Sequence, residues 1–258
     1  MRLSEKKNEK KPDDQSSKGS IKEEQINYKI DGKTYKGYVY YKEHQEGKRP
    51  GILVVHEWWG LNDYSRHRAK QLAQLGYISM AVDMFGNGKT VEDPGSAQDL
   101  AMPFYNDPSL CKKLLEPAID LLKTYPKTDN SKIGAIGYCF GGFVVLNAAK
   151  LGADLQGVVS FHGGLGGAKS EKGKVKAEIL VCHGAEDPMA NPDLDEFKKQ
   201  MKEADKDYTF KVYADATHAF SNPNATAKGE KYKMPIKYNE AADKASWNDM
   251  KAFFKKIF

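Results

Sequence analysis

The chain is 258 residues long; 40% of these are hydrophobic and 29% charged, and the net charge is +5 at pH 7. This length allows a sizeable core, with two helical layers around a sheet. Basic residues are scattered among acidic ones instead of forming a patch with interleaved aromatics, and no apolar stretch is long enough to span a bilayer. We therefore expect no nucleic-acid partner and no membrane partner.

The beginning of the chain is too polar to join a core. Residues 1–22 alternate among lysine, glutamate, aspartate and serine, and they lack the apolar stretch of a signal peptide. This pattern predicts a disordered polar tail at residues 1–22 and a single domain at residues 23–258. We expect a cytoplasmic location, and the alternative is an exported protein whose native leader has been replaced.

Short apolar runs bounded by turn residues predict strands, and longer runs with apolar residues at helical spacing predict helices. In chain order, strands are expected at residues 25–30, 34–41, 51–56, 77–82, 132–137, 155–161, 178–182 and 208–213. Helices are expected at residues 63–75, 141–151, 194–204 and 240–258, and in a segment that ends near residue 124. Residues 86–110 are predicted to be irregular, and Pro117 is expected to kink or divide the helix around it.

Strands that alternate with helices are typical of an α/β protein with a mostly parallel central sheet and helices on both faces. In such sheets the ligand site lies at the carboxyl ends of the strands. This rule draws attention to the polar residues that directly follow predicted strands, among them Glu57, Cys139 and His162.

Residues 137–142 (GYCFGG) follow a predicted strand and open a predicted helix. This is the context of a nucleophile elbow, in which the flanking glycines allow a sharp turn with the nucleophile at its apex. The turn would present the Cys139 sulfur near the positive end of a helix, which favours the thiolate. A buried cysteine with only a packing role is the alternative.

Enzymes with a nucleophile elbow carry the nucleophile, the acid and the histidine in that order along the chain. Asp187 follows the strand predicted at residues 178–182, and His218 follows the last predicted strand. We expect His218 to take the thiol proton and Asp187 to orient the imidazole ring. Glu186 is the competing acid.

The sequence Glu-Trp-Trp-Gly directly follows the first strongly apolar strand. In this architecture that loop supplies one backbone N–H group of an oxyanion hole, and the residue after the nucleophile supplies the other. The two donors would be Trp58 and Phe140. Glu57 would hold the proton of the resting thiol, or else form a structural ion pair with Arg66 or Arg68.

The other cysteines and histidines give no sign of a metal or a cofactor. Three cysteines give no disulfide framework, and no two histidines have the spacing of metal ligands. Cys111 and Cys182 are predicted to be small buried apolar residues. His162 and His183 are expected to satisfy backbone groups at strand ends.

The chain resembles the dienelactone hydrolase family of the α/β-hydrolase superfamily. The resemblance rests on four motifs, GYCFGG, HEWWGLND, VCHGAEDP and DATHAF, and covers residues 25–258. It implies an α/β-hydrolase fold with Cys139 as nucleophile, His218 as base and Asp187 as acid. It also implies that Glu57 pairs with the resting thiol, and that the backbone of Trp58 contributes to the oxyanion hole.

Two departures from the family pattern concern the substrate. Members that cleave dienelactone carry two arginines for the substrate carboxylate, and Asn87 and Asn222 stand at the matching positions. Neither asparagine supplies a charge to a carboxylate. The sequence therefore predicts a neutral ester or lactone rather than dienelactone. The aromatic side chains of Trp59, Phe85 and Phe220 are expected to favour apolar groups, although Trp59 equally suits ordinary packing.

Taken together, the sequence predicts a cysteine-dependent hydrolase of esters or lactones that works through a Cys-His-Asp triad and a thioester acyl-enzyme. The expected partner is a small-molecule substrate, and the chain is expected to be a monomer or a homodimer. The alternative is a thiol-reactive ligand-binding or redox protein on a hydrolase scaffold, because a catalytic site can degrade while its fold persists.

Overall fold

The computed structural model describes residues 19–258. Residues 1–18 of the predicted tail lie outside the described residues, and the first strand, β1, begins at Ile21, so the last two residues of the predicted tail belong to a strand. No helix within residues 19–258 combines the length and the apolar character needed to cross a membrane.

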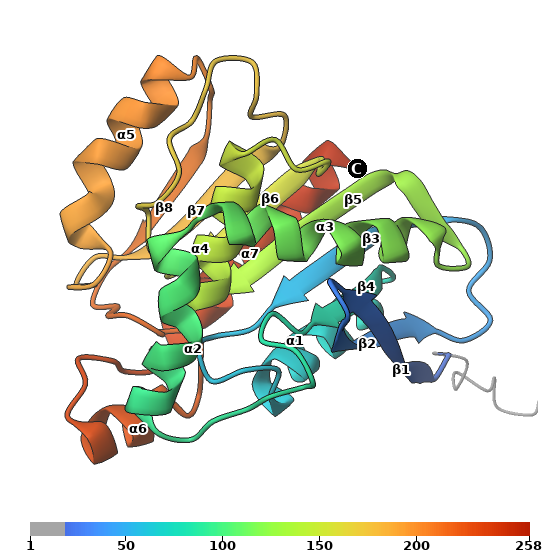
Figure 1. Ribbon diagram of the computed structural model, residues 1–258, viewed down its shortest axis with the longest axis horizontal. Helices are drawn as coiled ribbons and strands as arrows, with labels where there is room; N and C mark the ends of the chain where they lie inside the picture. The colour runs from blue at the N-terminus through green and yellow to red at the C-terminus, as the bar shows by residue number, and fades with distance from the viewer. Residues whose placement is uncertain (1–18) are drawn as a thin grey trace, which may run out of the picture.

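One eight-stranded sheet runs through the molecule in the order β1-β2-β4-β3-β5-β6-β7-β8 (Figure 1). Strands β1 and β2 form an antiparallel hairpin, β2 pairs antiparallel with β4, and all the other neighbours are parallel. The strands are β1 (Ile21–Ile30), β2 (Lys33–Lys42), β3 (Arg49–Val55), β4 (Ile78–Val82), β5 (Thr128–Tyr138), β6 (Gly157–Phe161), β7 (Glu178–Gly184) and β8 (Thr209–Tyr213). The predicted mostly parallel sheet is confirmed.

Helices cover both faces of the sheet, as predicted. They are α1 (Asp63–Gln74), α2 (Pro94–Asn106), α3 (Ser109–Thr124), α4 (Phe140–Lys150), α5 (Leu194–Glu203), α6 (Ala225–Tyr232) and α7 (Glu240–Ile257), with a short 3₁₀ helix, η1 (Asn191–Asp193), before α5. One core cluster joins the sheet to α2, α3, α4 and α5, and the cluster on the other face joins it to α1 and α7. In Figure 1, α3 and α4 accordingly lie in front of the sheet, while α7 lies behind it.

The segment predicted to be irregular, residues 86–110, contains helix α2. Pro94 occupies its first turn, where a missing N–H group costs nothing, and the Asp93 side chain accepts a hydrogen bond from Ser96 N at 2.9 Å. Pro103 near its end hid the helical pattern. Pro117 does not divide its helix, because α3 continues through it from Ser109 to Thr124. The short helix α6 was also not predicted.

The turn between β5 and α4 allows an unusually close approach of backbone to backbone. Cys139, at its apex, has a φ of 52°. A β-carbon on Gly137 would collide with the carbonyl of Gly141, and one on Gly141 would lie 2.7 Å from the carbonyl oxygen of His56 and closer still to that of Val55. Because these obstacles are backbone atoms, they cannot move aside as a flexible side chain would.

We predict that Gly141→Ala lowers the free energy of unfolding by about 3 kcal/mol or more, since overpacking against backbone forces the chain to shift. Gly95→Ala is the matched control, because the nearest atom to its new methyl group is Asp93 Oδ1 at 3.3 Å. Urea titrations of both variants check the prediction, which fails if Gly141→Ala is as stable as Gly95→Ala.

Candidate active site

Cys139 lies between the carboxyl end of β5 and the first residue of α4, where the sequence predicted a nucleophile. Its own amide group is held by two acceptors, with Phe161 O at 3.0 Å and His162 Nδ1 at 3.1 Å. The side chain is half-buried. A sulfur at the start of a helix faces unsatisfied N–H groups and the positive end of the helix dipole, which stabilise negative charge.

His218 bridges Cys139 and Asp187. Its Nε2 atom lies 2.9 Å from Cys139 Sγ, and its Nδ1 atom lies 2.8 Å from Asp187 Oδ2. The other carboxylate oxygen of Asp187 accepts backbone N–H groups from Met189 at 2.9 Å and Ala190 at 3.2 Å. The competing acid, Glu186, is exposed. The acid beside the histidine is therefore the one that the sequence favoured.

The surroundings of His218 and Asp187 shift the pKa values of the two groups in opposite directions. Burial lowers the pKa of His218, but the charge of Cys139 and the hydrogen bond to Asp187 outweigh it and hold that pKa well above its ordinary value. Burial works to raise the pKa of Asp187, but the hydrogen bond and the charge of His218 prevail and lower it. The His218 ring is therefore favoured in its protonated form beside the Asp187 carboxylate.

Glu57 is 3% exposed and lies in the same site. Its Oε2 atom accepts a hydrogen bond from Asn222 Nδ2 at 2.6 Å. Burial raises the pKa of Glu57 from 4.5 to about 7, and the bond from Asn222 offsets only part of this effect. The alternative of a structural ion pair between Glu57 and Arg66 or Arg68 is not observed. Arg66 pairs with Glu23, and Arg68 pairs with Asp243.

The backbone amides of Trp58 and Phe140 are the two groups that the sequence predicted for an oxyanion hole. Neither N–H group donates to an acceptor within residues 19–258. Trp58 lies on the wall of the pocket that contains Cys139. Phe140 is the first residue of α4, so its N–H group is one of the four that a helix leaves without an internal partner.

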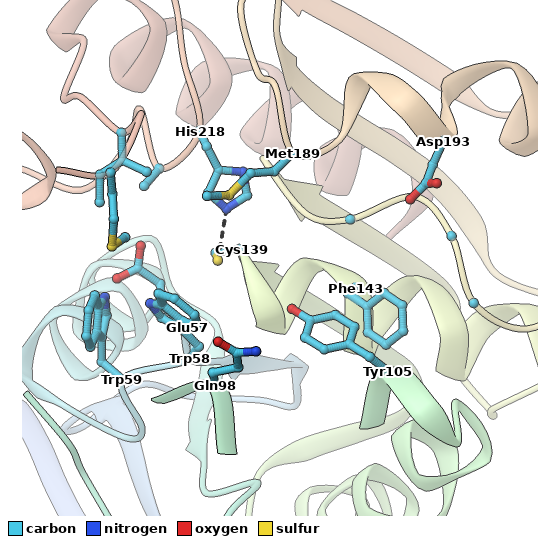
Figure 2. A pocket seen from close by; sticks show the side chains of 16 residues that line it. Glu57, Trp58, Trp59, Gln98, Tyr105, Cys139, Phe143, Met189, Asp193 and His218 are labelled. Atoms are coloured by element: carbon cyan, nitrogen blue, oxygen red, sulfur yellow. Dashed lines mark hydrogen bonds between the residues drawn. The ribbon is translucent and has the colours of Figure 1, made fainter. Parts of the chain in front are cut away.

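Cys139, His218 and Glu57 open into a pocket of about 440 Å³. Figure 2 shows Cys139 and His218 near its centre, with Glu57 and the two tryptophans on one side and the rings of Tyr105 and Phe143 on the other. The remaining lining residues are Gln98, Gly164, Gly166, Gly167, Met189, Asp193, Ala219, Met234 and Ile236. Four of these lining side chains are aromatic and two are methionines.

Of the five residues expected to contact substrate, only Trp59 lines this pocket. Phe85 packs among the buried rings of the core, and Phe220 packs against the His162 and Tyr213 rings. Asn87 is exposed, and its backbone N–H donates to the β1–β2 hairpin. Asn222 is buried; it does not line the pocket but donates a hydrogen bond to Glu57, which does.

Several lining residues were missed because they come from elements that the sequence did not reveal. Gln98 and Tyr105 belong to helix α2, and Met234 and Ile236 follow helix α6. Met189 stands two residues after Asp187 on the same loop. An amphipathic pattern in α2 was the only available signal, and Pro103 interrupted it.

The glycine-rich segment of the pocket wall, residues 164–167, is hydrogen-bonded to side chains of α4. Asn147 Nδ2 donates to Gly166 O at 3.2 Å, and its Oδ1 accepts the N–H group of Ala168 at 2.6 Å. Lys150, whose side chain is fully buried, donates to Leu165 O at 2.9 Å. Burial lowers the pKa of Lys150 to about 8. Glycine has more backbone freedom than other residues, and these hydrogen bonds restrict the conformation of this segment.

No lysine or arginine side chain lines the pocket within the described part of the chain, whereas Glu57 and Asp193 both do. Asp193 is the N-cap residue of α5, but its side chain makes no capping hydrogen bond. Within those residues, no group of three or more His, Cys, Asp or Glu side chains is arranged to hold a metal ion.

Comparison with known proteins matches residues 35–258 to the model of the dienelactone hydrolase family. "Protein usf" of Aquifex pyrophilus is 31% identical over 80% of this chain and 87% of its own length. A solved structure named m3DLH is 33% identical with a TM-score of 0.87, over 93% of this chain and all of its own. A dienelactone hydrolase-like promiscuous phosphotriesterase from metagenomic libraries is 31% identical with a TM-score of 0.85, over the same shares.

These similarities confirm the predicted α/β-hydrolase fold and the resemblance seen in the four motifs. The matched region begins within β2 and includes Glu57, Cys139, Asp187 and His218. The chain belongs to the dienelactone hydrolase family and is a hydrolase of ester or lactone bonds.

Proposed function

We propose that this protein hydrolyses neutral carboxylic esters or lactones with Cys139 as nucleophile, His218 as general acid and base, and Asp187 as the supporting acid. The observation that carries this proposal is the continuous chain of contacts, 2.9 Å and 2.8 Å long, from the Cys139 sulfur through the His218 ring to Asp187. Cys139 lies at the N-terminus of α4, and Cys139 and His218 line a pocket whose volume suits a small substrate. We infer that residues 23–258 form the one domain that carries it.

In the first half-reaction, the Cys139 thiolate attacks the carbonyl carbon, and the carbonyl oxygen becomes an oxyanion held by the N–H groups of Trp58 and Phe140. His218 gives its Nε2 proton to the departing alkoxide as the C–O bond breaks, which leaves a thioester on Cys139. His218 then takes a proton from water, and the resulting hydroxide attacks the thioester. The C–S bond breaks, and the thiolate beside a protonated His218 is restored.

The charges around the pocket support a neutral substrate. Besides His218, its lining contributes the carboxyl groups of Glu57 and Asp193, and no lysine or arginine side chain within residues 19–258. A substrate carboxylate would therefore meet like charges and find no bidentate arginine. Tyr105 and Met189, both partly exposed at the pocket, add apolar surface for an alkyl or aryl group.

The rival reading, a redox or thiol-reactive protein, needs a second thiol that can reach Cys139. Cys182 is fully buried in the core cluster on the side of α1 and α7, and the Tyr213 hydroxyl lies 3.6 Å from its sulfur. Burial raises the pKa of the Cys182 thiol to about 12, so it stays protonated at neutral pH. This makes Cys182 a poor resolving cysteine and favours hydrolysis.

We predict that Cys139→Ala lowers kcat/KM for p-nitrophenyl butyrate by at least about 10³-fold, because the reaction then lacks its covalent intermediate. Cys111→Ala, which removes a buried thiol from helix α3, should keep the wild-type rate. Release of p-nitrophenol is followed at 405 nm, roughly the maximum of the phenolate, with circular dichroism as a test of folding. Undiminished turnover by a folded Cys139→Ala variant would exclude the cysteine mechanism.

Substrate charge gives a second prediction. The methyl ester of 4-acetoxybenzoate should be hydrolysed with a kcat/KM at least about tenfold higher than that of 4-acetoxybenzoate itself, a difference of about 1.4 kcal/mol. Asp193→Asn should narrow this gap, since it removes one of the two lining carboxylates. Equal or faster turnover of the charged ester by the wild type would show that the pocket accepts anions.

Glu57 gives a prediction about stability. Because its pKa rises from 4.5 to about 7 on folding, the folded protein binds this proton more tightly than the unfolded chain does. The resulting stabilisation is complete below pH 4.5 and is lost as the pH rises through 7. It amounts to roughly 3 kcal/mol at most.

Urea titrations at pH 5 and pH 8 test this loss. The free energy of unfolding should fall less between these pH values in Glu57→Gln than in the wild type. Glu186→Gln, which alters an exposed carboxylate, should behave as the wild type does. Identical pH slopes in all three proteins would mean that Glu57 does not titrate in this range.

A further inference from the structure

His162 connects the nucleophile to the loop that carries the catalytic histidine. Its Nδ1 atom lies 3.1 Å from the backbone nitrogen of Cys139, and its Nε2 atom lies 2.7 Å from Ser221 Oγ. Ser221 stands three residues after His218 on the same loop. His162 is 1% exposed, Ser221 is completely buried, and the His162 and His218 rings lie 5.5 Å apart. The sequence predicted only a backbone-satisfying role for His162.

The direction of each hydrogen bond follows from the chemistry of its partners. A backbone N–H group can only donate, so His162 Nδ1 accepts from Cys139 and carries no proton. The proton of a neutral ring is then on Nε2, which donates to Ser221 Oγ. Burial, followed by the charge of His218, holds the pKa of His162 well below its ordinary value, so the ring stays neutral.

Ser221 is fixed in turn by helix α1. The Tyr64 hydroxyl lies 2.8 Å from Ser221 Oγ and 3.1 Å from Ser221 O. Arg68 also donates to Ser221 O at 2.8 Å, and its Nε–H group points to the Tyr64 oxygen at 3.4 Å. Since a carbonyl oxygen can only accept, Tyr64 donates its proton to Ser221 O, and Ser221 Oγ then donates to Tyr64.

The backbone of His162 adopts a strained conformation that a hydrogen bond to the neighbouring strand holds in place. Its φ is 42°, in the left-handed region that non-glycine residues seldom occupy. Its backbone N–H donates to Cys182 O at 2.8 Å, which holds it at the end of β6 beside β7. Strain of this kind persists only where the surroundings compensate for it, and it is frequent at functional sites.

We propose that His162 and Ser221 are positioning residues, which hold the elbow of Cys139 and the loop of His218 at a fixed separation through a directed chain of hydrogen bonds that ends at Arg68. This inference rests on the proposed function. The two catalytic groups come from segments 79 residues apart, which the sheet brings to one edge without pairing β5 directly with β8. The bridge adds a direct link between the two segments.

Ser221→Ala tests the bridge. It removes the acceptor of His162 Nε2 and should lower kcat about tenfold to a hundredfold, since a misplacement of about 1 Å has that effect. KM should change less than about twofold, because the pocket lining is untouched. Ser79→Ala is the matched control: its hydroxyl is equally buried and donates to Ala69 O at 2.6 Å, between β4 and α1. It should keep the wild-type kcat.

The rate of Cys139 alkylation by iodoacetamide separates this inference from the proposed function. Ser221→Ala should alkylate more slowly than Ser79→Ala, whatever substrate the enzyme turns over. If both variants retain kcat and alkylation rate, the bridge is structural only and the inference is wrong. If Cys139→Ala remains active while Ser221→Ala still alkylates slowly, the proposed function fails and the bridge stands.

A measurement on the wild type covers the case in which Ser221→Ala does not fold. Long-range ¹H–¹⁵N correlation spectra report which ring nitrogen of each histidine carries a proton. His162 should show a proton on Nε2 alone from pH 5 to pH 9, roughly the range in which an unperturbed histidine changes its charge. A protonated Nδ1, or a change of state within this range, would overturn the proposal.

Discussion

His218 touches the sulfur of Cys139 at 2.9 Å although 79 residues separate the two along the chain. A contact of this length requires that the carboxyl end of β5, the loop after β7 and the loop after β8 meet at the same edge of the sheet. Parallel pairing through β5, β6, β7 and β8 brings those ends together, and the glycines of the elbow let α4 start close to β3. The hydrolase chemistry of the family depends on this edge.

The loop that carries His218 makes several further contacts around the pocket. Ser221 meets His162 and Tyr64, and Asn222 meets Glu57, so three contacts to the site follow one another within five residues. Arg68 of α1 donates to Ser221 O in the same loop and is itself paired with Asp243 of α7, on the far face of the sheet. The position of His218 is thereby coupled to the packing of α1 and α7 against the sheet.

Much of this arrangement could be predicted from the sequence, because its signals are local. The elbow is a six-residue motif, and the order of nucleophile, acid and histidine is a property of the chain alone. The pocket walls were less predictable. Phe85 and Phe220 were expected to meet substrate but pack into the core, since an aromatic residue near a site gives the same local pattern in either role. Tyr105 and Met234 were missed because they depend on helices α2 and α6, and the bridge of His162 depends on how separate loops meet.

The central claim is that turnover passes through a thioester on Cys139. The most direct measurement mixes the enzyme with p-nitrophenyl acetate, quenches it in acid within milliseconds and locates the acetyl group by peptide mass spectrometry. The account predicts acetylation of the peptide that carries Cys139, and loss of the acetyl group on treatment with neutral hydroxylamine. Turnover without any acetylated Cys139, or with the acetyl group on another residue that is required for activity, would contradict it.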